Sequence, residues 1–232
     1  MKDIYKEMYN ENRILELRGN PRIEVMRSII DKLDLNNANV LDIGCYDGTF
    51  LLKIKNKNAH LFGIEASDFG VKKCEENGII AKQFFFDDKN PAPFESGFFD
   101  VVIIGEIIEH IYDTDFFLEE ISRLLKPNGK LLISTPNIAS FGRRMLLLLG
   151  RNPIIELSPN ENDSSGHIRY FTFDTLKKLL NKHNFGVIVR KSDVVNLSNS
   201  GKLQISFFSK LLPGLCQSII ILCEKNNHAD SE

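Results

Sequence analysis

The feature that most restricts the fold of this chain is a regular alternation of short apolar runs with amphipathic stretches through its central part. The apolar runs lie at 39–43, 60–64, 79–86, 99–104 and 130–135, and the amphipathic stretches lie at 49–54, 68–77 and 114–125. Strands and helices in this alternation form βαβ units around a mostly parallel sheet, and near-continuous apolar strands suit a sheet covered on both faces. We therefore predict an α/β fold with helices on both faces of its sheet.

The length and composition predict that residues 1–232 form a single domain. Hydrophobic residues make up 43% of the chain, which is enough for a sizeable core, and no internal repeat is evident. The N-terminal part, 1–34, is expected to be helical, with its second helix at 21–33. The last residues, 225–232, are expected to form a flexible tail.

The alternation breaks at 138–166, a segment that carries two arginines, a leucine run and a polar patch. We interpret this segment as a lid inserted over the strand ends. A helical pattern resumes at 174–183, and two further strands are predicted near 187–194 and 218–223.

Charge and cysteine content exclude several classes of protein. The net charge of -2 gives no general attraction to nucleic acid, which is therefore not expected as a partner. No apolar stretch is long enough to span a bilayer, and the first residues lack the apolar part of a signal peptide. No cysteine pair has the spacing of a zinc or redox motif, so all are interpreted as reduced thiols of a cytoplasmic protein: Cys45, Cys74, Cys216 and Cys223.

Residues 40–51 carry the clearest indication of a ligand site. An apolar strand ends at Asp42, and a turn containing Gly44 and Gly48 leads into the next helix. Glycine permits a tight turn and a close approach of the backbone to a ligand. Ligands of open α/β sheets bind beyond the carboxyl ends of the strands, and a helix N-terminus offers free N–H groups there.

Glu65 ends the following strand, about 20 residues after the glycine turn, where a carboxylate can accept the ribose hydroxyls of an adenosine-type cofactor. The loop lacks the G-x-G-x-x-G pattern of a dinucleotide site. The negative charge of Asp42 is unfavourable beside a pyrophosphate and favourable beside a cofactor that carries an ammonium and a sulfonium. The pattern thus favours S-adenosylmethionine.

These motifs resemble, in the same order, those of the class I S-adenosylmethionine-dependent methyltransferases. The strand and glycine turn are similar to their motif I, and Glu65 matches their ribose-binding acid. The stretch 125–133 looks like their turn into the fifth strand. The resemblance implies a Rossmann-like, seven-stranded, mostly parallel sheet with an inserted lid segment.

The resemblance also implies a set of cofactor-binding residues: Asp42, Gly44, Cys45, Tyr46, Gly48, Glu65, Ala66, Asp87 and Gly105. Tyr46 departs from the family pattern, since it stands where the usual G-x-G-x-G has its middle glycine. Asp87 is the candidate for the adenine contact, with Asp88 as the alternative. Gly105 is either a backbone contact to the methionine part of the cofactor or an ordinary turn at a strand end.

Within the family, the chain resembles the ubiquinone-biosynthesis O-methyltransferases and the MetW-like proteins. The first resemblance depends on Glu-Ile-Ile-Glu-His at 106–110 and on a later stretch that begins at His167, and the second on 141–150. They imply methylation of an oxygen on a small molecule such as a sugar, a polysaccharide precursor or a quinone-like acceptor. Glu109 and His110 become the catalytic candidates, with His110 as general base because imidazole titrates near neutrality.

The same resemblance implies a divalent metal, from magnesium to manganese or zinc, held by Glu106, Glu109, His110 and His167. The first three would share one face of a helical turn that begins at Glu106. The alternative is that the carboxylates only favour a helix start and that the histidine braces a loop.

Two other functions stay open from the sequence. A MetW-like protein would bind the cofactor and act through a partner protein. An RNA 3′-terminal ribose 2′-O-methyltransferase shares the Glu-x-x-Glu-His pattern, although the charge of -2 and the lack of a basic stripe argue against it. The leucines at 146–149 belong either to a packed lid helix or to a surface that touches a membrane or a lipid substrate.

Overall fold

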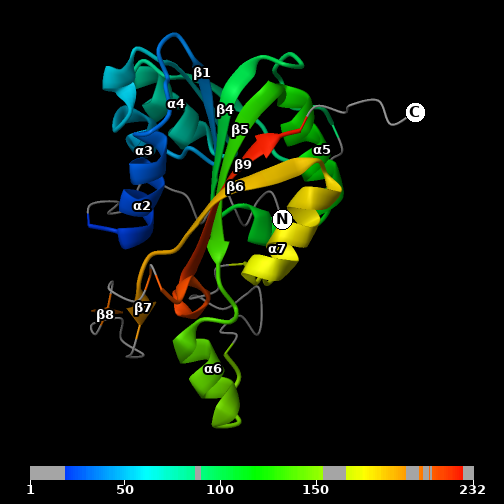
Figure 1. Cartoon of the computed structure of the whole chain (residues 1–232). Coiled ribbons are helices and arrows are strands. Elements are labelled where there is room, and N and C mark those ends of the chain that lie inside the picture. Colours follow the sequence, from blue (N-terminus) through cyan, green and yellow to red (C-terminus); the bar gives the residue numbers. More distant parts are fainter. Residues whose placement is uncertain are drawn as a thin grey trace.

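The computed structural model describes residues 19–86, 90–153, 166–196, 204–205, 209 and 211–226. Its centre is a seven-stranded sheet in the order β3-β2-β1-β4-β5-β9-β6 (Figure 1). The strands are β1 Asn39–Ile43, β2 His60–Glu65, β3 Ile80–Gln83, β4 Phe99–Gly105, β5 Leu125–Pro136, β6 Phe185–Lys191 and β9 Ser218–Lys225. β9 alone runs antiparallel to the other six strands of this sheet, so the predicted α/β fold with a mostly parallel seven-stranded sheet is confirmed.

Helices cover both faces of this sheet (Figure 1). The described helices are α2 Pro21–Ile30, α3 Thr49–Leu52, α4 Asp68–Glu76, α5 Thr114–Leu124, α6 Phe141–Leu148 and α7 Phe173–Lys182, with short 3-10 turns η1 Lys55–Lys57, η2 Ile108–His110 and η4 Pro213–Leu215, and all of the α-helices except α6 lie against the sheet. Val40 packs in one core with residues of α2, α3 and α4, whereas Leu41 packs in the other with residues of α5 and α7. Because successive strand residues point to opposite faces, the strands need the unbroken apolar runs seen in the sequence.

Local capping sets where the helices begin near the sheet. The Asn20 side chain accepts a hydrogen bond from the Arg22 N–H, and Pro21 occupies the first turn of α2. The Ser67 side chain accepts one from the Gly70 N–H at the start of α4. These caps satisfy N–H groups that a helix start leaves unpaired. The cap of α2 also places Arg22 in the first turn of the helix.

Three element boundaries differ from the sequence prediction. The strand expected at 79–86 is the short edge strand β3, and the one expected near 187–194 ends at Lys191. A two-stranded ribbon that the sequence did not indicate follows, with β7 Val195–Asn196 paired to β8 Gln204–Ile205. The flexible tail does not begin at 225, because Lys225 ends β9 and its Nζ donates hydrogen bonds to the Ser122 and Leu125 carbonyls.

The segment expected to be a lid is described only in part. Residues 138–153 contain α6, which projects from the molecule beyond the end of β5 (Figure 1), and residues 154–165 lie outside the described residues. Its closing over a pocket therefore stays a prediction. Among the described residues, none of the helices combines the length and the apolar character that crossing a bilayer would require.

Candidate functional site

The carboxyl ends of β1, β2 and β4 bring together residues that the sequence singled out. Asp42 lies near the end of β1, Glu65 ends β2 and Gly105 ends β4. β1 pairs with β2 on one side and with β4 on the other, so the chain order of the sheet reverses at this strand. A crevice at such a reversal is the usual ligand site of an open α/β sheet.

The loop after β1 contains three residues in the left-handed region of backbone conformation. Their φ angles are 74° at Gly44, 47° at Tyr46 and 78° at Gly48. The left-handed conformation favours glycine at Gly44, and a Cβ there would lie 2.4 Å from Ile107 Cδ1, so that the Ile107 side chain would have to shift. Tyr46 takes a left-handed conformation without being a glycine, and the tight turn forms despite this departure from the family pattern.

Glu65 ties this loop to the start of α4. Its Oε2 accepts a hydrogen bond from the Tyr46 N–H at 2.9 Å, and its Oε1 accepts one from the Ser67 N–H at 2.9 Å. Burial raises the pKa of the Glu65 carboxyl, and these backbone hydrogen bonds oppose that rise. A carboxylate oxygen has two lone pairs, so both oxygens retain acceptor capacity for ribose hydroxyls.

Asp42 is a buried acid at the end of β1 whose carboxyl has a raised pKa. Its side chain is buried, and this burial together with the nearby charge of Glu65 raises its pKa to about 8, while Arg22 acts in the opposite direction. A cationic ligand would favour the ionised form of both carboxyls. The two buried acids thus fit a cofactor that carries an ammonium and a sulfonium.

We expect the protein without cofactor to lose stability as the pH rises from about 4 to about 8. These limits are the ordinary pKa of the Asp42 carboxyl, 3.8, and its pKa in the folded chain, about 8. In this window the folded chain keeps a proton that the unfolded chain has released. Each pH unit therefore lowers the free energy of unfolding by up to about 1.4 kcal/mol. Asp42→Asn should reduce this slope in thermal unfolding curves by the contribution of Asp42, while Glu109, whose folded pKa is also about 8, keeps its own contribution. Asp68→Asn, which changes an exposed acid at the start of α4, is the control. Equal pH slopes in wild type and Asp42→Asn would contradict the assignment.

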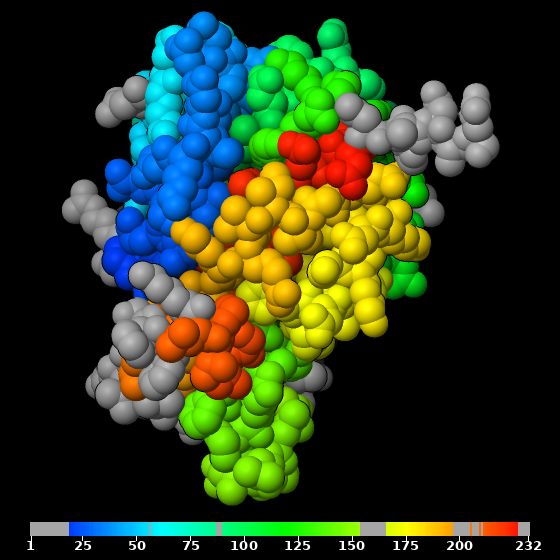
Figure 2. All heavy atoms as spheres, viewed as in Figure 1, coloured from blue at the N-terminus to red at the C-terminus, as the bar shows by residue number. Residues whose placement is uncertain are grey.

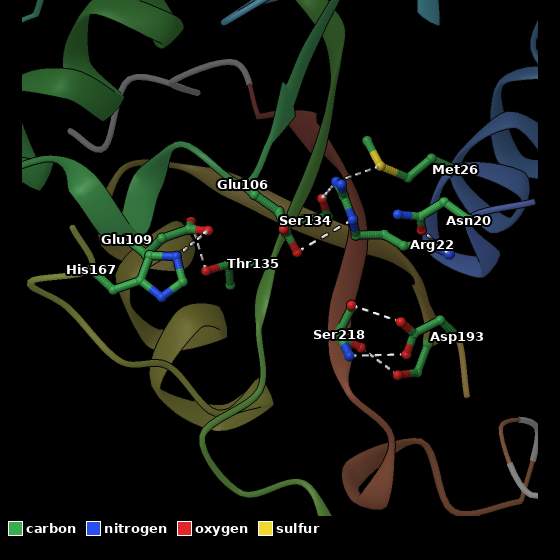
Figure 3. A network of polar contacts seen from close by, with 11 residues as sticks. Asn20, Arg22, Met26, Glu106, Glu109, Ser134, Thr135, His167, Asp193 and Ser218 are labelled. Atoms are coloured by element: carbon green, nitrogen blue, oxygen red, sulfur yellow. Dashed lines mark hydrogen bonds and ion pairs between the residues drawn. The ribbon is translucent and has the colours of Figure 1, made fainter. Parts of the chain in front are cut away.

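Arg22 is a site residue that the sequence analysis missed. Its Nε lies 3.3 Å from Glu106 Oε1, and its guanidinium donates a hydrogen bond to Ser134 Oγ at 3.2 Å (Figure 3). The same group stands 3.4 Å from where a Cβ on Gly105 would be. An arginine in the first turn of a helix carries no motif, and only the packing of α2 against the sheet brings it here.

Glu109, His110 and His167 form a second cluster near the end of β5. Ser134 and Thr135 are consecutive in β5 and point to opposite faces, Ser134 toward Arg22 and Thr135 toward Glu109 (Figure 3). Thr135 Oγ1 donates a hydrogen bond to Glu109 Oε2 at 2.9 Å. Glu109 is 1% exposed, and burial, assisted by the charge of Glu106, raises its pKa to about 8.

The other oxygen of Glu109 faces the two histidines. Within the described residues Glu109 Oε1 has no hydrogen-bond partner, and it lies 3.9 Å from His167 Nε2. The rings of His110 and His167 are 4.8 Å apart. One ligand atom from each of the three residues lies within 4.8 Å of the others. One carboxylate and two imidazoles at this spacing form a donor set suited to a divalent cation.

Backbone hydrogen bonds bring His167 to this place from a distant part of the chain. The Glu109 carbonyl accepts hydrogen bonds from the N–H groups of Ile168 and Arg169 at 3.0 and 3.1 Å. His110 Nδ1 lies 3.2 Å from the Gly166 carbonyl oxygen, which can only accept, so Nδ1 is the donor. The stretch that precedes α7 is therefore held against η2.

The structure corrects the predicted helical face of Glu106, Glu109 and His110. Glu106 has a φ of 57° and precedes η2, which begins only at Ile108. Its carboxylate pairs with Arg22, whereas Glu109 and His110 meet His167. Glu106 thus lies apart from the other three candidates for metal binding, because its left-handed backbone and its position before η2 prevent the shared helical face.

Two of the remaining predicted cofactor residues, Cys45 and Ala66, have contacts within the described part of the chain, and their role toward a cofactor stays a prediction. Cys45 Sγ is 3.5 Å from Cys74 Sγ, and both side chains are buried. The Ala66 carbonyl accepts a hydrogen bond from Gln83 Nε2 at 2.9 Å. Asp87 and Asp88 lie outside the described residues, so the choice between them stays a prediction.

Comparison with known proteins identifies the chain's relatives. A family described as a methyltransferase domain matches residues 17–189. The ubiquinone biosynthesis O-methyltransferase of Pelagibacter ubique is 26% identical over 212 residues, which cover 87% of this chain and 76% of that protein. The protein of the same name from Xylella fastidiosa is 28% identical over 142 residues. In that second alignment the chain spans about half of the relative, 54% of its length.

Solved structures show the same fold at low sequence identity. A methyltransferase from Thermotoga maritima, described as a possible histamine N-methyltransferase, superposes with a TM-score of 0.67 at 19% identity and covers 97% of this chain and all of that one. A methyltransferase from Archaeoglobus fulgidus superposes with a TM-score of 0.60 at 18% identity, with 88% of this chain and 92% of that one covered. The chain therefore shares its fold with these methyltransferases.

Proposed function

The chain belongs to the class I S-adenosylmethionine-dependent methyltransferases, and on that premise we propose that it methylates an oxygen atom of a small hydroxylated molecule. Quinone-like rings, sugars and polysaccharide precursors are the acceptor classes that we infer. The observation that carries the proposal is the cluster of Glu109, His110 and His167, which gathers proton-accepting groups at the end of β5, the strand that pairs with β4 at Gly105. The name of the Pelagibacter ubique relative, a ubiquinone biosynthesis O-methyltransferase, supports oxygen as the acceptor atom.

The cofactor site would be formed by the loop after β1, Glu65 and Arg22. S-adenosylmethionine supplies a methyl group that its sulfonium already activates for in-line attack. The glycine turn lets the backbone approach the cofactor, and Glu65 accepts the ribose hydroxyls. Asp42 provides negative charge beside the ammonium and the sulfonium. Asp87, or its neighbour Asp88, would contact the adenine.

We also infer that Arg22 binds the carboxylate of the methionine part. The Arg22 guanidinium pairs with the Glu106 carboxylate and lies over Gly105. An arginine at this place matches a second carboxylate by charge and by the geometry of its donors. The pair with Glu106 thus holds the guanidinium at the methionine end of the crevice.

His110 is the candidate base for the acceptor hydroxyl. Its Nδ1–H donates to the Gly166 carbonyl, and a neutral ring therefore carries its lone pair on Nε2. An imidazole with this tautomer accepts a proton from a hydroxyl in the transition state and contributes about 10²–10⁴-fold to the rate. Glu109 and Thr135 hold the turn that carries His110.

A divalent cation at the cluster is the second way in which these residues would act. The buried, unpaired Glu109 Oε1 and the two imidazoles fit such an ion, and this donor set suits manganese or zinc better than magnesium. A bound cation would supply Lewis acidity that lowers the pKa of the acceptor hydroxyl. His110 is then a ligand rather than a base, so the two roles exclude each other.

Methyl transfer to a panel of catechols, phenols and sugars tests the proposed function. We expect label from S-adenosylmethionine to appear in a methyl ether of at least one acceptor class, identified by mass spectrometry. Cofactor binding without transfer to any class would favour a MetW-like protein that acts through a partner. Salt-dependent retention of RNA with transfer to its 3′ end would favour the RNA alternative.

Removal of metal separates the two roles of His110. If the cluster holds a cation, excess chelator should abolish turnover, and manganese or zinc should restore it. Calorimetric titration of the same metals should show at least about tenfold weaker binding to Glu109→Gln, because the carboxylate supplies the only negative charge among the three ligands. Glu106→Gln is the matched control, since Glu106 pairs with Arg22 instead. Full turnover in chelator without heat of metal binding would leave His110 as a base.

A further inference from the structure

The thiols of Cys45 and Cys74 meet beside the loop that follows β1. Cys45 lies in this loop, and Cys74 lies in α4, 29 residues later. Their Sγ atoms are 3.5 Å apart, and the two residues are 5% and 0% exposed. The segments that contain α3 and α4 lie side by side in Figure 2, and both cysteines pack in the core that these helices share. The loop and α4 are thus in contact through two sulfur atoms.

Two glycines provide the space that these sulfur atoms occupy. A Cβ on Gly63 of β2 would lie 2.4 Å from Cys45 Sγ, and a Cβ on Gly48 would lie 3.3 Å from Cys74 Sγ. A side chain at Gly63 would displace the Cys45 thiol, and one at Gly48 would crowd the Cys74 thiol. The contact between the sulfurs therefore depends on the backbone around them as well as on the two cysteines.

The Cys74 thiol also holds the backbone of Tyr46. Cys74 Sγ donates a hydrogen bond to the Tyr46 carbonyl oxygen at 3.2 Å. A thiol carries one proton, so within the sulfur pair Cys45 is the donor and Cys74 is the acceptor. The Tyr46 N–H donates to the Glu65 carboxylate. The N–H and the carbonyl of this one residue are thus tied to the proposed ribose acid and to a thiol.

Tyr46 makes the loop sensitive to a change at Cys74. Its φ of 47° lies in the left-handed region, which a residue other than glycine adopts at a cost in free energy. Such a conformation persists only where the surrounding contacts fix it. The hydrogen bond from Cys74 is one of these contacts, and it is lost when the thiol loses its proton.

We propose that Cys45 and Cys74 form a modification site, at which oxidation to a disulfide releases the Tyr46 carbonyl and weakens cofactor binding. The effect on the cofactor rests on the proposed function. A disulfide joins sulfur atoms about 2.05 Å apart, so the two atoms must approach each other by about 1.5 Å, which rotation of the side chains can supply. The sulfurs of a disulfide carry no proton, so the bond to the Tyr46 carbonyl cannot persist.

The oxidant for this step is a low-molecular-weight disulfide such as oxidised glutathione. The Cys45 thiolate attacks one sulfur of the oxidant, breaks its S–S bond and releases the first small thiol. The Cys74 thiolate then attacks Cys45 Sγ and releases the second. In balance, the protein loses two S–H bonds and gains one S–S bond, and the reduced oxidant takes up both protons. Cys45 reacts first because it keeps some exposure, whereas Cys74 has none.

This oxidation is slow while the loop is closed. The hydrogen bond with Cys74, together with burial, raises the pKa of the Cys45 thiol, and only the thiolate attacks. Attack therefore requires local opening of the loop. A bound cofactor would hold the loop closed, so saturating S-adenosylmethionine is expected to slow formation of the disulfide at least about fivefold.

Incubation of the full chain with oxidised glutathione, followed by mass spectrometry without reductant, tests the site. We expect the intact mass to fall by two hydrogen atoms, and the peptide that contains Cys45 to be linked to the one that contains Cys74. Calorimetry should then show that the oxidised protein binds S-adenosylmethionine at least about tenfold more weakly than the reduced protein, because the loop loses a hydrogen bond. Dithiothreitol should restore the affinity.

Cys74→Ser is the decisive variant, because its hydroxyl can still donate to the Tyr46 carbonyl but cannot form a disulfide. Its affinity for the cofactor should not respond to the oxidant. Cys216→Ala and Cys223→Ala are the matched controls, since each removes a buried cysteine that lies outside the loop and α4. Both should form the link between Cys45 and Cys74 as the wild type does.

Three results would overturn the proposal. They are a wild-type mass that does not fall, a stable mixed disulfide on one cysteine only, and an oxidised protein that binds the cofactor as well as the reduced one. The link is detected without cofactor, so its absence is distinct from failure of the reduced protein to bind S-adenosylmethionine, which would contradict the proposed function.

Discussion

Replacement of His110 by alanine is expected to lower kcat by about 10²–10⁴, which is the range that a positioned proton acceptor contributes. The loss is expected whether His110 is the base or a metal ligand, since both roles act on the acceptor hydroxyl. Affinity for S-adenosylmethionine should stay close to that of the wild type, because His110 contacts the Gly166 carbonyl and the His167 ring, which are not among the predicted cofactor-binding residues. Steady-state kinetics with the best acceptor of the panel, together with calorimetry of cofactor binding, measure both quantities.

The matched control for this change is His60→Ala, which removes an exposed histidine at the start of β2, at the opposite end of the strand from Glu65. It should leave kcat unchanged. A His110→Ala enzyme within about twofold of wild-type kcat would remove this residue from the chemistry, since general bases contribute far more than that. The cluster would then be a structural brace between η2 and the stretch before α7.

Replacement of Glu65 by alanine is expected to weaken binding of S-adenosylmethionine by about 10- to 150-fold, which corresponds to the loss of about 1.5–3 kcal/mol for hydrogen bonds to a charged group. Two effects add here. The ribose hydroxyls lose their acceptor, and the buried N–H groups of Tyr46 and Ser67 lose theirs, so the loop is less well held. Isothermal titration calorimetry measures the affinity, and thermal unfolding without ligand measures the effect on the loop.

Glu76→Ala controls for the loss of a carboxylate. Glu76 lies at the end of α4, where it is exposed and paired with Lys73, so its removal should change neither quantity measurably. Glu65→Gln should fall between wild type and Glu65→Ala, because its single carbonyl oxygen can replace only one of the two acceptors. Equal cofactor affinity in wild type and Glu65→Ala would remove Glu65 from the ribose site.

The sheet and the cofactor loop could be predicted because their signals are local. A strand buried on both faces needs consecutive apolar residues, as at Val40 and Leu41, and this requirement is visible within a few residues of sequence. A turn that crosses into the left-handed region favours glycine, as at Gly44 and Gly48. The position of Glu65 follows from the same strand and turn pattern.

Which side chains contact one another near these strand ends depends on packing between segments that are distant in the sequence. Arg22 reaches the site because α2 packs against the sheet, and no local pattern distinguishes it from other arginines. Glu106 and Glu109 look equivalent in the sequence, but a left-handed backbone at Glu106 directs one to Arg22 and the other to His167. The alternation of Ser134 and Thr135 in β5 keeps the two groups apart.

By itself, the sequence determined the mostly parallel α/β sheet, the class of cofactor and the acid at the end of β2, because each of these depends on residue types at short spacing. Only the tertiary structure decided that Arg22 faces Glu106, that His167 joins Glu109 and His110, and that three leucines of α6 stay uncovered. These arrangements depend on backbone turns and on contacts between residues far apart in the chain, and neither leaves a periodic signal in the sequence.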